Sequence, residues 1–90
     1  MSQHLETILL KEFLKDNNIN IKESGGSDVF WCFKNHKVLA QILYSIDKGL
    51  FHLLKPHETG YYIIYLSQPD CFSIILEIIQ ESIDLEHISS

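Results

Sequence analysis

The central part of the chain, from Asp28 to Leu66, is almost continuously apolar and is interrupted by short polar breaks. Its runs are rich in aromatic and β-branched residues, which favour strands. The breaks contain Gly, Asn, Asp and Pro, which turns and strand ends prefer. The pattern therefore predicts antiparallel strands at residues 29–34, 38–46, 50–55 and 61–66.

The N-terminal part of the chain predicts a helix and a further strand. Residues 3–16 place apolar side chains on one helical stripe, and Ser2 is suited to cap the helix. At 18–22, Ile19 and Ile21 alternate with polar residues, which is typical of a half-buried strand. The glycines that follow predict a turn at 24–27.

A second helix is expected at 70–85, with Ser67 as a possible cap. Its apolar arc covers more than half of the circumference, so it should be buried on more than one side, against the sheet and the first helix. The order of helix, strands and helix predicts one α+β domain over residues 1–90. We expect an antiparallel meander of four to five strands, flanked by an N-terminal and a C-terminal helix.

Residues 35–48 also fit a third helix, and this alternative stays open. Asn35 is suited to an N-cap and Gly49 to a C-terminal cap, and the apolar positions recur at helical spacing: Val38, Leu39, Ile42, Leu43 and Ile46. The strand interpretation rests on 47–49, a triplet suited to a three-residue hairpin loop with Gly in the left-handed conformation. We prefer the strand.

The predicted strands are apolar on both faces. Trp31 and Phe33 fall on one face, for example, and Phe30 and Cys32 on the other. A sheet with one solvated face is normally polar at every second position. Large exposed apolar patches usually mark interaction sites. Either a second copy or another protein should therefore cover the second face, unless a third helix covers it.

The charges are distributed unevenly along the chain. The net charge is −5, and all seven basic residues are Lys, the last of which is Lys55. The remaining residues, 56–90, carry six carboxylates and no basic side chain. This distribution disfavours nucleic acids and anionic membranes, and the lack of Arg removes the residue best suited to phosphate. A basic protein is the partner that the charge favours.

Candidate chemical groups are few. Cys32 and Cys71 lie in apolar runs, which is typical of buried, reduced thiols in a cytoplasmic protein. His52, His57 and Glu58 could bind zinc, but solvated turn residues are the preferred interpretation. The sequence shows neither a secretory signal nor a run of the roughly 18 apolar residues that a membrane span needs. We predict no catalytic residue, no metal and no cofactor.

The sequence thus favours a non-enzymatic acidic protein-binding module. An immunity protein or antitoxin-type inhibitor that masks a basic partner, such as a nuclease toxin, is the leading hypothesis. The predicted partner-binding residues are Glu58, Tyr61, Glu77, Glu81, Asp84 and Glu86. The alternative is a small homodimeric scaffold or chaperone-like protein that uses the apolar second face of the sheet.

Overall fold

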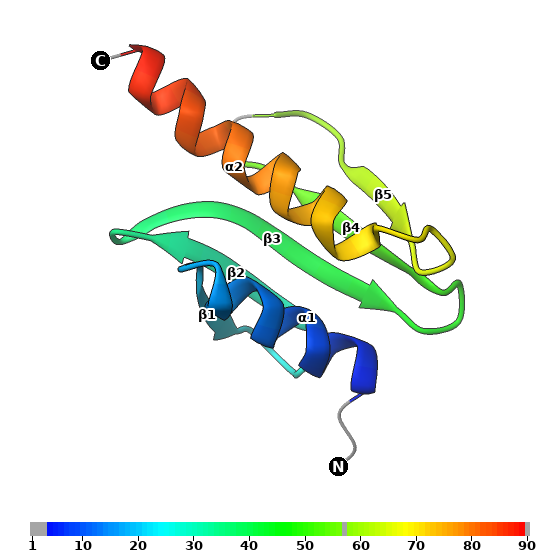
Figure 1. Ribbon diagram of the computed structural model, residues 1–90. Coiled ribbons are helices and arrows are strands. Elements are labelled where there is room, and N and C mark those ends of the chain that lie inside the picture. The colour runs from blue at the N-terminus through cyan, green and yellow to red at the C-terminus, as the bar shows by residue number, and fades with distance from the viewer. Residues whose placement is uncertain (1–3, 57, 90) are drawn as a thin grey trace.

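The computed structural model describes residues 4–56 and 58–89, with the backbone alone for 82–89. In these residues the chain forms two helices and five strands, in the predicted α+β order (Figure 1). The elements are α1 (Leu5–Asp16), β1 (Asn20–Glu23), β2 (Val29–Lys34), β3 (Lys37–Ser45), β4 (Leu50–Leu54), β5 (Tyr62–Tyr65) and α2 (Cys71–Ser89).

The strands form one antiparallel meander in the order β1-β2-β3-β4-β5. The strand interpretation of residues 35–48 is therefore confirmed, and the alternative of a third helix is wrong. As a strand, β3 pairs with β2 on one side and with β4 on the other, so its backbone groups have partners on both sides. Asn35, expected as a cap in the helical alternative, instead has a φ of 54° in the β2–β3 turn.

Two tight turns explain the strand order. Asn35 and His36 both have positive φ, as the two central residues of a type I′ hairpin require. The β3–β4 loop runs from Ile46 to Gly49, where Gly49 has a φ of 64° and its N–H donates to the Ser45 carbonyl at 2.9 Å. Gly49 is left-handed as predicted, but the loop is longer by one residue because Ile46 leaves the strand.

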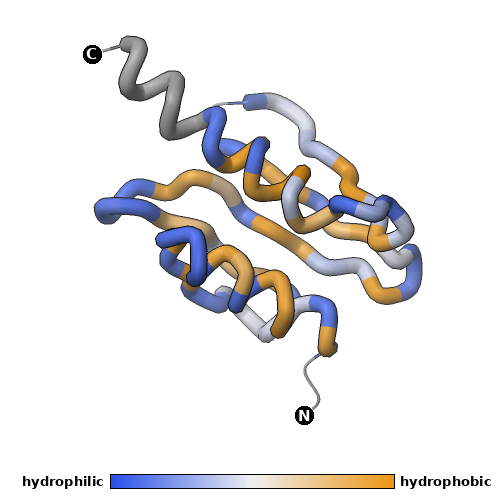
Figure 2. The backbone as a smooth tube through the Cα atoms, in the orientation of Figure 1, coloured by the Kyte–Doolittle hydropathy of each residue, from blue (hydrophilic) through white to orange (hydrophobic). Residues whose placement is uncertain are grey.

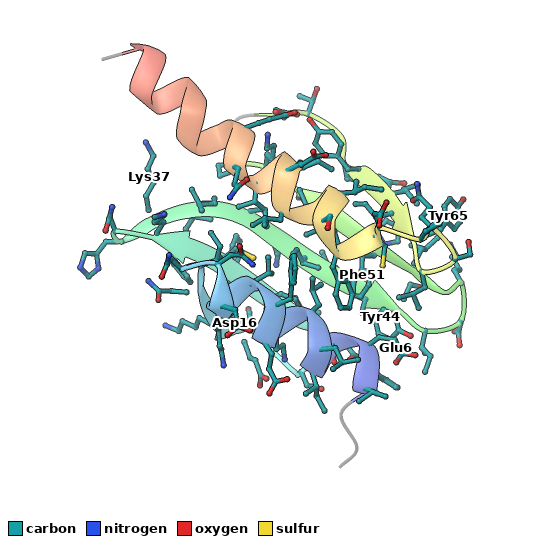
Figure 3. All side chains as sticks on the ribbon, in the orientation of Figure 1. Glu6, Asp16, Lys37, Tyr44, Phe51 and Tyr65 are labelled. Carbon is teal, nitrogen blue, oxygen red and sulfur yellow. The ribbon has the colours of Figure 1, made fainter. Side chains whose placement is uncertain are left out.

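Both helices lie on the same side of the sheet, with α1 against β1 and α2 against β3 and β5 (Figure 1). The core fills the space between these layers, and polar residues gather in the turns (Figure 2). The rings of Phe13 and Phe72 are 5.9 Å apart and join the two helices. Tyr44 and Phe51 lie between the helices on the sheet, with ring centroids 5.0 Å apart (Figure 3). We call this side of the sheet the inner face.

The helix ends differ from the sequence prediction in detail. His4 precedes α1, and its carbonyl accepts hydrogen bonds from the N–H and hydroxyl of Thr7 at 3.1 and 2.8 Å. The predicted cap, Ser2, lies outside the described residues. The second helix begins at Cys71, so Ser67 lies in the preceding turn rather than directly before the helix.

Candidate functional site

The side of the sheet turned away from both helices is the candidate site, and we call it the outer face. Its side chains stand in rows because neighbouring strands are in register and alternate residues share a face. One row crosses β1 to β4, and a second crosses β2 to β5. The rows are Lys22, Trp31, Gln41 and Leu54, and then Val29, Leu43, His52 and Ile63.

A β-bulge shifts the pairing of β2 with β3 next to the row that contains Trp31. The pairing of β2 with β3 shifts between Cys32 and Phe33, so that Cys32 faces Ala40 and Phe33 faces Val38. Leu39 is the extra residue. The bulge lets Leu39 and Ala40 both be buried, although they are consecutive. It also keeps Val38 on the outer face beside Phe33.

The outer face is apolar and aromatic, and the described part of the chain leaves it open to solvent. Three side chains at its β5 end are about half exposed: Tyr61 at 57%, Ile63 at 45% and Tyr65 at 50%. Tyr65 lies at the β5 edge in Figure 3. Tyr61 precedes β5 and packs against His52, with ring centroids 5.0 Å apart. Trp31 is half-buried in the middle of β2.

Two shallow hollows adjoin on the outer face around Trp31 and Val38. One, of about 330 Å³, is lined by Lys22, Glu23, Ser24, Trp31, Phe33 and Val38. The other, of about 410 Å³, is lined by Trp31, Val38, Gln41, Leu54, Lys55 and Pro56. The side chains of Trp31 and Val38 border both hollows. The first hollow thus recesses the β1–β3 end of the outer face and the second continues to β4, whereas the large side chains at the β5 end are about half exposed.

The two rows of the outer face are almost free of charge. Lys22, at the β1 edge, is the one residue in these rows that carries a formal charge, with His counted as neutral. The described glutamates with assigned partners lie elsewhere. Glu23 contacts Lys11 at 2.6 Å beneath α1, and Glu58 and Glu81 contact Lys55. Glu23 also borders the first hollow, whereas Glu58 and Glu81 are separated from the two apolar rows.

Two of the predicted partner-binding residues meet at one lysine. The carboxylates of Glu58 and Glu81 each lie 3.7 Å from the Lys55 ammonium, which is buried. Tyr62 donates a 2.8 Å hydrogen bond to Glu58, and this bond is the main reason that the pKa of Tyr62 is raised. Tyr61, by contrast, belongs to the outer face.

The other predicted residues have different positions. Glu77 is exposed on α2. Asp84 and Glu86 lie among the residues whose side chains are not described. Glu58 and Glu81 thus compensate a buried cation and are themselves exposed, as are Glu77 and Tyr61.

Sequence reasoning missed the two buried lysines. Lys55 has about 7% of its surface exposed, and Lys11 about 6%. Lys11 belongs to α1, and its ammonium donates to the Ser27 carbonyl at 2.7 Å and stands over the Phe30 ring. A signal for Lys55 was present: it continues the alternation of Phe51 and Leu53, both of which point to the inner face.

The candidate chemical groups are not brought together. Cys32 is buried on the inner face, where desolvation raises its pKa to about 12, and Cys71 is half-buried at the start of α2. His52 lies on the outer face, and His57 lies outside the described residues. Among the described residues, no cluster of three His, Cys, Asp or Glu side chains is arranged to hold a metal ion.

Within the described residues, neither helix is both long and apolar enough to cross a membrane. Comparisons of the chain with family models, with curated proteins and with solved structures find no match.

Proposed function

We propose that this chain is a non-enzymatic protein-binding module that self-associates through its outer face. The observation that carries the proposal is the continuous apolar surface formed by the two cross-strand rows and the exposed β5 side chains. Contiguous apolar patches of this kind are rare on monomeric proteins and mark contact surfaces. A second copy offers the same surface, whose two rows contain no carboxylate and a single charged residue, Lys22, at the edge.

The size of the face is sufficient for a specific contact. Five strands spaced about 4.8 Å apart, with about five residues each, give a face of roughly 400 Å² in projection. Because side chains roughen the surface, two such faces bury on the order of 1,000 Å², which is the lower range of specific interfaces. The acidic groups on α2 and in the β4–β5 loop would point away from the contact.

The first experiment measures the molar mass of the protein by light scattering during size-exclusion chromatography. The wild type should elute with twice the single-chain mass of 10.5 kDa, at low and at high salt, because the contact is apolar. Ile63→Glu should convert it to a single chain, since a charge at the contact must be desolvated.

Leu9→Glu is the matched control for this substitution. Leu9 lies on α1 and is as exposed as Ile63, at 45%. The Leu9→Glu substitution introduces the same charge on the helical side of the molecule and should leave the dimer intact. A single-chain mass for the wild type, or equal effects of the two substitutions, would contradict the proposal.

A second candidate keeps the inhibitor hypothesis, in which the acidic side of the molecule masks a basic protein. It is supported by the exposure of Glu77 on α2, away from the outer face. The association rate with a basic nuclease should fall as salt rises, because steering between opposite charges is screened. Glu77→Gln should slow association more than Glu12→Gln, which removes the same charge from α1. Salt-independent rates would exclude this candidate.

We also propose a cytoplasmic location for either function. The two cysteines are free, as expected for a protein in a reducing compartment.

A further inference from the structure

The outer face is asymmetric. Tyr61, Ile63 and Tyr65 project at its β5 end, where each is about half exposed. The first hollow lies at its β1–β3 end, and the second extends from Trp31 and Val38 across to Leu54 of β4. A surface that projects at one end and is recessed at the other is complementary to a reversed copy of itself.

On the basis of the function proposed above, we propose that two copies pack face to face with β5 of each over β1 and β2 of the other. A twofold axis parallel to β3, in the plane of the contact, produces this arrangement, because it turns the sheet over and exchanges its two edges. The contact is then isologous, as in most homodimers. Aligned strands are also a common geometry for two packed sheets.

The strand register identifies which side chains meet. Leu53 pairs with Tyr62, so Tyr61 stands next to Leu54 and at the level of the row that contains Lys22 and Trp31. An axis parallel to the strands preserves this level. Tyr61 of one copy therefore lies over Lys22 and Trp31 of the other, and enters the hollow that these residues line.

The chemistry of this contact is favourable. Tyrosine and tryptophan rings pack well against each other and often dominate the energy of interfaces. The Lys22 ammonium can donate to the Tyr61 hydroxyl or lie over its ring, so the single formal charge of the two rows gains a partner. Tyr61 and Lys22 remain near the rim of the contact, where the tyrosine hydroxyl and the lysine ammonium reach water.

The opposite orientation fits the face less well. An axis perpendicular to the strands places β5 over β5 and β1 over β1. The projecting side chains then meet each other, the hollows face each other and stay unfilled, and the two Lys22 ammonium groups share one edge. Unfilled space loses dispersion contacts, and like charges repel.

The test places a photoreactive group at the projecting end of the full-length protein. Tyr61→p-benzoylphenylalanine retains an aromatic ring and can be crosslinked by light. Mixing chains with and without heavy isotopes identifies crosslinks between copies by mass spectrometry. Crosslinked dimer should form, and the crosslinks should fall in residues 20–34 of the other copy.

The same amino acid at Ile46 is the control, because Ile46 is also about half exposed, at 53%, but lies in the β3–β4 loop at the end of the sheet. Little crosslinked dimer should form from that position. In addition, Tyr61→Ala should raise the dissociation constant of the dimer by about tenfold or more, as expected for an aromatic anchor.

The outcomes separate this inference from the function on which it rests. A dimer by light scattering whose crosslinks fall in β5 or in a helix of the other copy would overturn the orientation and leave the proposed function standing. A single-chain mass at every concentration, without crosslinked dimer, would overturn the proposed function and the orientation together.

Discussion

At the scale of single residues, position on one face of the sheet determines the chemistry of a side chain. Cys32 faces Ala40 on the inner face and is fully buried. Desolvation of the thiolate raises its pKa from 9.0 to about 12. The thiol is therefore neutral over the physiological range and poorly nucleophilic, because the thiolate is the reactive form. This agrees with the sequence-based interpretation of Cys32 as a core residue.

The raised pKa of Cys32 predicts a specific loss of stability at alkaline pH. Above pH 9.0 the unfolded chain releases the thiol proton and the folded chain retains it until about pH 12. The free energy of unfolding should then fall by about 1.4 kcal/mol per pH unit within this window from Cys32 alone.

Urea denaturation across the window tests this slope, with Cys32→Ala as the control. The variant should be less stable overall but should show a shallower decline with pH. The tyrosines with raised pKa, Tyr44 and Tyr62, are present in both proteins, so the difference isolates Cys32. Parallel declines in the two proteins would show that the thiol does not contribute.

At the scale of elements, composition predicted the strands well and their limits less well. The aromatic and β-branched runs became β2 to β5, because side chains of this shape pack on a pleated surface. The helical spacing of apolar residues in 35–48 was misleading. A strand that is apolar on both faces has apolar residues at almost every position, and therefore also at positions with helical spacing. The decisive local signal was the pair of turns that contain Asn35 and Gly49.

The β3–β4 loop supplies a prediction at this scale. Gly49→Ala should lower the free energy of unfolding by about 1 kcal/mol, because a left-handed φ strains a residue that has a Cβ atom. Clashes with other parts of the molecule do not contribute, since beyond the neighbouring residues an added Cβ would meet nothing within 4 Å. The opposite exchange, His36→Gly, should be neutral or stabilising, because His36 has a φ of 66°. Equal losses in both variants would contradict this explanation.

At the scale of the whole molecule, the sequence indicated an uncovered apolar face but not which residues would lie on it. Assigning Trp31 and Leu54 to the same surface requires the register of two strand pairs, which depends on long-range packing. The acidic set was predicted as one surface from its sequence position alone. Two of its members, Glu58 and Glu81, are exposed and also contact buried Lys55, an interaction that only the tertiary structure reveals.

The meander also bears on how the chain assembles during synthesis. Each strand pairs with the next one along the chain, so the sheet can form by successive local hairpins, which is a fast route for a β structure. The inner face, however, is covered over β3 and β5 by α2, which follows β5 in the chain. A nascent chain that has completed β5 therefore holds its outer face, and the part of its inner face that α1 does not cover, open to water until α2 emerges from the ribosome.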